Sequence, residues 1–170
     1  GNREDLGIIV QGGLYNSLLR TMERLGVADA FGGTQIPMYV LNVAYPLIDN
    51  EINEFCDGKR AVLLVEEGQP NYIEQALNTS LRQSGCEATL VGKGALPMAG
   101  EYTSRVLRAG VVDFLGHFDP EFQPPDDPLR LVAEFIEAID PHVPPRPPGL
   151  CTGCPERPVF AALKLLQEEL

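Results

Sequence analysis

Four short apolar segments occur between residues 6 and 91, each separated from the next by a stretch with helical spacing. The segments are 6–11 (LGIIVQ), 38–43 (MYVLNV), 61–65 (AVLLV) and 88–91 (ATLV). Apolar runs of this length are typical of strands that are buried on both faces of a sheet. Because strands that alternate with helices indicate βαβ units with right-handed crossovers, we expect an α/β fold. Its sheet should be mostly parallel and flanked by helices.

Helices are expected between and after these strands. Apolar residues three and four positions apart predict helices over 14–25, 71–83, 105–115 and 129–139. A shorter helix should begin near Pro46 or Asp49 and run to about Phe55. Three of the segments are followed by glycines that are typical of helix ends, namely Gly26, Gly58 and Gly85.

The composition changes abruptly at Pro141. The stretch 141–149 (PHVPPRPPG) is so rich in proline that it predicts neither a helix nor an interior strand, and we expect a stiff, extended linker. Helical spacing returns from Val159 to the last residue. The predicted organisation is therefore an α/β domain over 6–140, a linker over 141–149, and the truncated start of a second domain over 150–170.

The charge and the cysteines restrict the class of protein. The formal net charge of −11 makes nucleic acid a poor partner, since phosphate binding needs clustered lysine and arginine. No apolar run reaches the ~20 residues that would cross a membrane, and no signal peptide is recognised. Cys56 and Cys86 lie far apart in sequence and do not form a disulfide framework. We therefore expect a cytoplasmic protein in a reducing compartment.

Two stretches resemble a known enzyme family. One is 41–47 (LNVAYPL), followed by 61–67 (AVLLVEE) and 72–74 (YIE), and the other is 146–157 (RPPGLCTGCPER). Together they resemble the large subunit, or the fused form, of indolepyruvate:ferredoxin oxidoreductase in the 2-oxoacid:ferredoxin oxidoreductase family. In that family a domain like the C-terminal domain of transketolase precedes a proline-rich linker and the thiamine-diphosphate-binding domain. The resemblance covers nearly the whole chain in matching order.

The resemblance implies a reaction for the longer parent enzyme. A 2-oxoacid such as indolepyruvate or another arylpyruvate is oxidatively decarboxylated to an acyl-CoA, with coenzyme A as acyl acceptor and ferredoxin as electron acceptor. The parent's cofactors would be thiamine diphosphate, magnesium and an iron–sulfur cluster, and none is expected on this segment alone. The segment should be mainly structural, contact other domains or subunits of the enzyme, contain no catalytic residue, and be inactive by itself.

Two alternatives stay open. The parent could act on pyruvate, 2-oxoglutarate or branched 2-oxoacids, since the substrate-side residues lie mostly outside this segment. The chain could also be a non-catalytic α/β module that binds a small ligand or a partner in the crevice at its strand ends.

The resemblance also nominates residues in the last segment. In the intact enzyme Gly153, Cys154, Glu156 and Arg157 would lie near thiamine diphosphate, and Cys151 with Cys154 would be iron–sulfur ligands. Glu156 departs from the family pattern, which places histidine there, and a carboxylate would repel a phosphate. The plainer interpretation of Cys151-Thr152-Gly153-Cys154 is a tight turn before a helix, and a redox dithiol is the least favoured one.

Other candidates have plain structural interpretations. Gln11-Gly12-Gly13 lies where such folds bind anions, but a tight turn that needs glycine is favoured. Glu66 and Glu67 could perform acid–base chemistry or bind a cation, although we expect one to cap the next helix and the other to be solvated. Isolated His117 and His142 are expected to be structural or exposed. The set Gly92, Gly94 and Gly100 lacks the spacing of a dinucleotide fingerprint.

Overall fold

The structure, a computed structural model, describes residues 3–127, 130–143 and 156–169. It divides into two units, residues 1–127 and 128–170. Each unit is described by itself below. Among the described residues, no helix is long and apolar enough to cross a membrane.

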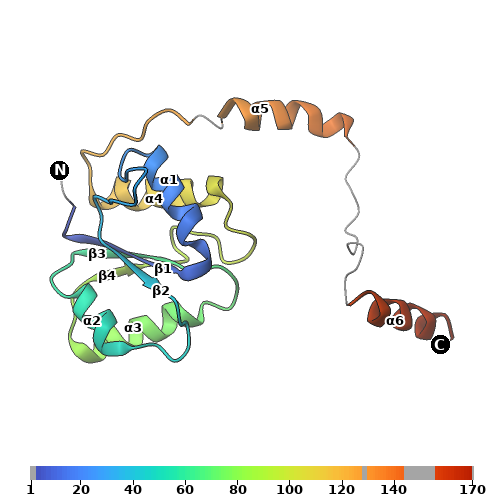
Figure 1. Cartoon of the computed structure of the whole chain (residues 1–170), viewed down its shortest axis with the longest axis horizontal. Coiled ribbons are helices and arrows are strands. Elements are labelled where there is room, and N and C mark those ends of the chain that lie inside the picture. The colour runs from blue at the N-terminus through green and yellow to red at the C-terminus, as the bar shows by residue number, and fades with distance from the viewer. Residues whose placement is uncertain (1–2, 128–129, 144–155, 170) are drawn as a thin grey trace. The chain divides into compact units, whose positions relative to one another are not determined.

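The first unit is built on a four-stranded sheet in which every strand pair is parallel. The strands are β1 (Leu6–Gln11), β2 (Met38–Leu41), β3 (Ala61–Val65) and β4 (Thr89–Val91), in the spatial order β2-β1-β3-β4 (Figure 1). Ile8 is central to the register, because it pairs with Met38 on one side and with Leu63 on the other. The predicted α/β fold with a parallel sheet is therefore confirmed.

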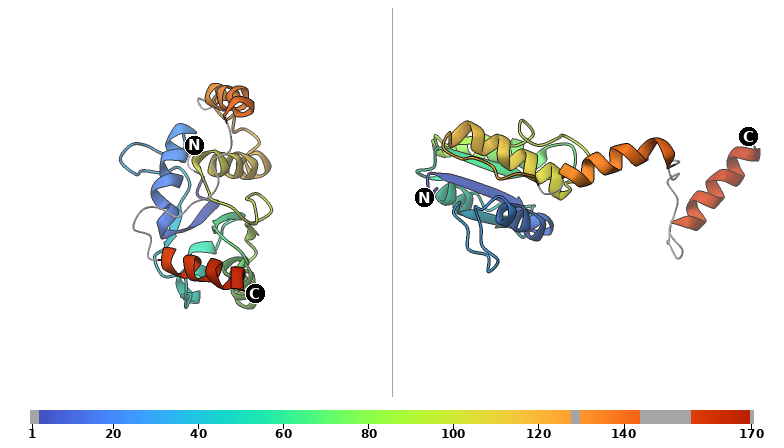
Figure 2. Two further views of the ribbon diagram at one scale, coloured as in Figure 1. Left: turned by 90° about the vertical axis from the view of Figure 1, so that its right-hand side faces the viewer. Right: turned by 90° about the horizontal axis from the view of Figure 1, so that it is seen from above.

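Helices cover both faces of the sheet (Figures 1 and 2). On one face lie α1 (Tyr15–Arg24) and α4 (Ser104–Phe118), which pack on the side chains of Ile8, Val10 and Leu63. On the other face lie α2 (Asp49–Cys56) and α3 (Tyr72–Ser84), which pack on Ile9, Val62 and Leu64. Because side chains alternate along each strand, both faces of these apolar runs are buried, as the sequence predicted.

Several predicted boundaries were wrong by a few residues. Strand β2 ends at Leu41 and not at Val43, because its neighbour β1 ends at Gln11, the partner of Leu41. Helix α4 extends to Phe118 and not to Leu115, and its additional turn packs the ring of Phe118 5.2 Å from that of Phe114. A short 3₁₀ helix over Gly12–Leu14 precedes α1. Helix α3 ends at a left-handed Gly85 (φ 74°), as expected for a glycine cap.

The second unit contains α5 (Arg130–Ile139), a 3₁₀ turn (Asp140–His142) and α6 (Arg157–Glu169). Both predicted helices of this region are present. The sequence prediction grouped α5 with the α/β domain, whereas the structure groups it with the second unit. Residues 144–155, which include most of the predicted linker, lie outside the described residues, so the domain limits of the intact protein stay a prediction.

Candidate functional site

The strand order places a crevice at the carboxyl ends of β1 and β3. The chain leaves β1 for β2 on one side and then returns to place β3 on the other, which makes β1/β3 the topological switch point where such folds bind ligands. A pocket of about 590 Å³ opens there. It is lined by Gln11, Ala44, Tyr45, Leu47, Glu66, Glu67, Gly68, Gln69, Pro70, Tyr72, Ile73 and Ala76.

Glu66 follows β3 directly and is only 5% exposed. One carboxylate oxygen accepts the backbone N–H of Ile73 at 2.9 Å, and the other accepts the N–H of Glu74 at 3.0 Å. These are first-turn donors of α3, which have no partner inside the helix. The expectation that one of the two glutamates caps the next helix is therefore confirmed, and Glu66 is that residue.

Glu67 has a different role from the one predicted. Its N–H donates to the side-chain oxygen of Gln11 at 2.8 Å, and its carboxylate accepts the N–H of Tyr102 at 2.6 Å. It is half-buried rather than simply solvated. The prediction of a solvated carboxylate was wrong because Tyr102 is distant in sequence and meets Glu67 only in the fold. Glu67 thus connects the end of β1 with the segment that leads into α4.

Lys93 follows β4 and connects two loops. Its ammonium donates to the backbone oxygens of Glu66 at 2.5 Å and Gly68 at 2.9 Å, and more weakly to that of Met98 at 3.4 Å. It also donates to the hydroxyl of Tyr102 at 2.9 Å and lies 5.0 Å from the centre of that ring. The ammonium therefore fixes the loop after β3, which forms one wall of the pocket, to the loop after β4.

Glu74 completes this cluster from α3. Its carboxylate accepts the N–H of Lys93 at 3.2 Å and the side-chain amide of Asn71 at 3.0 Å. A Cβ atom added at Gly92 would lie 2.6 Å from the carboxyl carbon of Glu74. A side chain at position 92 would therefore have to displace this carboxylate from its hydrogen bonds.

Tyr102 is the most buried polar side chain that contacts Lys93, with 3% of its surface exposed. Burial raises the pKa of Tyr102 to about 12, and the negative charges of Glu66, Glu67 and Glu74 contribute to the rise. The phenol therefore stays protonated near neutral pH and donates to the backbone oxygen of Pro97 at 2.6 Å. Its neutral hydroxyl is a structural hydrogen-bonding group here.

The cluster has a formal excess of negative charge. The linked contacts of the cluster include three carboxylates, those of Glu66, Glu67 and Glu74, and one ammonium, that of Lys93. Two negative charges thus remain beside the pocket, and they disfavour a phosphate or a carboxylate ligand. Within the described residues, no three of His, Cys, Asp and Glu are arranged to hold a metal ion. The alternative of a cation held by the paired carboxylates Glu66 and Glu67 stays a prediction.

The turn after β1 is explained by close packing. A Cβ atom added at Gly12 would lie 3.1 Å from the side-chain oxygen of Asn42 and 3.3 Å from the backbone oxygen of Leu41. The turn therefore passes close to the end of β2, and an added Cβ would push its neighbours there by a few tenths of an ångström. This geometry agrees with the favoured interpretation of Gln11-Gly12-Gly13 as a tight turn.

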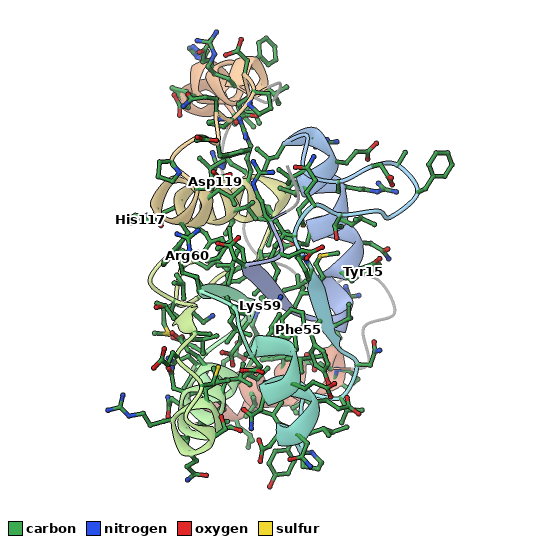
Figure 3. All side chains as sticks on the ribbon, turned by 90° about the vertical axis from the view of Figure 1, so that its left-hand side faces the viewer. Tyr15, Phe55, Lys59, Arg60, His117 and Asp119 are labelled. Carbon is green, nitrogen blue, oxygen red and sulfur yellow. The ribbon has the colours of Figure 1, made fainter. Side chains whose placement is uncertain are left out.

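Ion pairs lie at the opposite edge of the sheet, where the strands begin; Figure 3 labels two of their members, Arg60 and Asp119. Arg3 pairs with Asp119 at 2.6 Å, and Arg60 pairs with Asp5 at 2.8 Å. Arg60 also donates to the backbone oxygen of Phe118 at 2.6 Å. Because both arginines are matched by carboxylates, this edge does not form an anion site.

The two cysteines of the first unit belong to its core. Cys56 is 0% exposed, and its burial is the main reason that the pKa of its thiol is raised to about 11. The nearby Cys86 adds to the rise, and Lys59 opposes it. The thiol of Cys86 lies 3.6 Å from the backbone oxygen of Cys56. Both are free thiols that pack with side chains of α2 and α3 in the core.

The residues nominated in the last segment are only partly described. Cys151, Gly153 and Cys154 lie outside the described residues. Glu156 and Arg157 are exposed at the start of α6, where the backbone oxygen of Glu156 accepts the N–H groups of Val159 and Phe160. Their roles near a cofactor or cluster stay predictions.

Neither histidine lines the pocket at the switch point. His117 lies at the exposed end of α4, with its Nδ1 2.9 Å from the backbone oxygen of Asp113 (Figure 3). His142 is exposed at the end of the 3₁₀ turn in the second unit. Both agree with the expectation of structural or exposed histidines.

Comparison with known proteins places these features in context. No family model matches the chain. Proteins named indolepyruvate oxidoreductase subunit IorA match it at 29% identity over 100% of the chain in Methanothermobacter thermautotrophicus, 31% over 94% in Thermococcus kodakarensis, and 31% over 98% in Archaeoglobus fulgidus. The chain spans about a quarter of the length of these relatives, 23–24%. Over nearly its whole length, this chain is therefore similar to a segment of the IorA subunit of indolepyruvate oxidoreductases.

Proposed function

We propose that this chain is a segment of an indolepyruvate-type 2-oxoacid oxidoreductase, which oxidatively decarboxylates arylpyruvates to acyl-CoA and passes the electrons to ferredoxin. The observation that carries the proposal is the similarity to IorA subunits over 94–100% of the chain. Because the chain corresponds to only a quarter of such a subunit, the reaction belongs to the longer parent protein.

Within the parent, the first unit has a structural role and contacts other domains or subunits. The support is its surface at the switch point, where Tyr45 is 91% exposed and Tyr72 is 69% exposed. The neighbouring side chains of Val43 and Ile48 are also exposed. Large apolar side chains that gather at one edge are typical of surfaces that a partner covers.

Thiamine diphosphate, magnesium and an iron–sulfur cluster are the cofactors of the proposed parent. Thiamine diphosphate would stabilise the negative charge left on the substrate carbon when carbon dioxide departs. The described residues do not make a complete site for these groups, since Cys56 and Cys86 are committed to the core. Cys151 and Cys154 would supply at most half of the about four ligands that a cluster needs.

The test is an anaerobic assay of the full-length parent with thiamine diphosphate, magnesium, coenzyme A and a viologen dye as electron acceptor. Dye reduction is expected with indolepyruvate or phenylpyruvate, and it should depend on coenzyme A. The chain of 170 residues, assayed in parallel, should not reduce the dye. A parent with Glu156→His, which restores the residue expected from the family, tests whether the carboxylate changes activity or substrate preference.

The outcomes separate the alternatives. Reduction with pyruvate, 2-oxoglutarate or branched 2-oxoacids would keep the reaction and change the substrate. No reduction by a folded parent loaded with its cofactors would contradict the proposal and favour the non-catalytic binding module. Dye reduction by the isolated chain would contradict its structural role.

A further inference from the structure

The pocket at the switch point has acidic walls and no basic side chain of its own. Glu66 and Glu67 line it, and its lining contains neither lysine nor arginine. The second carboxylate oxygen of Glu67 accepts no hydrogen bond from the described residues. Because no buried side-chain oxygen among the described residues lacks a partner, this oxygen is open to solvent, where a charged donor that enters the pocket can bond it.

The nearest ammonium is not available for this purpose. Lys93 directs its donors to the backbone oxygens of Glu66 and Gly68 and to the hydroxyl of Tyr102. It is thus held behind the loop that forms the pocket wall, and it is not among the lining residues. The excess negative charge of the cluster remains for a cation that comes from outside these residues.

The rest of the pocket is apolar and aromatic. Leu47, Ile73 and Ala76 form apolar wall, while Tyr45 and Tyr72 are the exposed aromatic residues of the lining. A long side chain with an apolar stem and a cationic end matches a pocket that has both an apolar, aromatic wall and an acidic wall. Guanidinium groups also stack on aromatic faces and bond carboxylates in a planar geometry, which an ammonium does not reproduce.

We propose that this pocket receives an arginine side chain from a segment of the same enzyme that lies outside these 170 residues. The identity of the donor as part of the same enzyme rests on the proposed function, whereas the chemistry of the pocket does not. The exposed Val43 and Ile48, which flank the lining residues in sequence, give the arriving segment an apolar surface around its arginine. The net charge of −11 favours such a basic partner further.

The test uses this chain labelled with ¹⁵N and two small probes. One is N-acetyl-arginine N-methylamide, and the other is the citrulline compound, which has nearly the same shape without the charge. At concentrations up to about 50 mM, in the range of weak single-residue contacts, the arginine probe should shift the amide signals of Gly68, Tyr72 and Ala76. The citrulline probe should shift them far less.

Two variants make the result specific. Glu67→Gln should weaken binding of the arginine probe by about tenfold, because a hydrogen bond to a charged carboxylate becomes one to a neutral amide. Glu87→Gln removes the same charge from an exposed site outside the pocket lining and should leave binding unchanged. The ¹⁵N spectrum of each variant reports directly whether it is folded.

Equal shifts with both probes, shifts located elsewhere, or no shifts at the highest concentration would overturn the proposal, as would unchanged binding by folded Glu67→Gln. These results are independent of the parent's dye-reduction assay, because no cofactor or substrate is present. Failure of the pocket proposal therefore leaves the proposed reaction intact. An inactive parent would in turn leave the arginine-binding pocket intact. It would remove only the inference that the arginine comes from the same enzyme.

Discussion

Replacing Lys93 by methionine tests whether its ammonium holds the wall of the pocket. Methionine keeps most of the apolar stem and removes the charge and the donors. The variant leaves the backbone oxygens of Glu66 and Gly68 and the hydroxyl of Tyr102 without their donor. It also removes the ammonium that the described residues place in the same cluster as three carboxylates.

The magnitude follows from these contacts. A buried polar group left without a partner costs about 1–3 kcal/mol, and Lys93 is half-buried, so water replaces part of what is lost. The cation–π contact with Tyr102 contributes about 0.5–1 kcal/mol. Repulsion among the remaining carboxylates acts in the same direction. We expect Lys93→Met to lower the free energy of unfolding by about 2–4 kcal/mol, a large part of the stability of a typical domain.

Urea unfolding followed by circular dichroism measures this change, with Lys164→Met as the matched control. Lys164 lies on the exposed surface of α6 in the second unit, where such a substitution changes stability by about 0.5 kcal/mol at most. If Lys93→Met matched the control, its ammonium would not be holding the two loops together. The structural account of the pocket wall would then be wrong.

Two further predictions concern the core. Gly110→Ala in α4 should destabilise the fold by about 1–3 kcal/mol, because the new Cβ would clash with the side chain of buried Leu96. Gly116→Ala in the same helix should instead stabilise the fold by about 0.5–1 kcal/mol, because its new Cβ would meet no atom within 4 Å. Equal shifts of the two melting temperatures would refute this difference. Cys56 should react with a thiol reagent more slowly than Cys86. Because the pKa of Cys56 is raised from 9.0 to about 11, its contribution to stability is fully present below pH 9.0 and is lost as the pH rises towards about 11. The melting temperature should therefore fall less steeply between pH 9 and pH 11 for Cys56→Ala than for the unchanged chain. Equal slopes for the two proteins would contradict the raised pKa of Cys56.

The sheet could be predicted because each strand is specified by its own residues. The run Ala61–Val65 is apolar at every position and is buried at every position in the structure. The ends were harder to predict because they depend on neighbours in space. Strand β2 ends where β1 provides no further partner, and α4 continues as far as the contact between Phe114 and Phe118. The first cause is not local in the sequence, whereas the second is a contact between residues four positions apart in one helix.

The site was predicted only where its parts adjoin a strand. Glu66 and Glu67 stand directly after β3, so their place at the crevice followed from the fold class. Lys93 and Tyr102 were missed, because their partners Glu66 and Glu67 lie 27 and 35 positions away along the chain. One local signal existed, since a glycine next to a strand end, here Gly92, often marks a close approach of another group.

The pocket's position and its chemistry have separate origins, and this decides what it can bind. The position follows from the order β2-β1-β3-β4 and is common to doubly wound sheets, many of which hold phosphates at this point. In those proteins the first N–H groups of a helix remain free to meet the anion. Here the carboxylate of Glu66 already occupies the first-turn donors of α3, and Glu67 adds a second negative charge beside it. This crevice therefore attracts cations rather than anions, which favours a basic side chain over a nucleotide as its occupant.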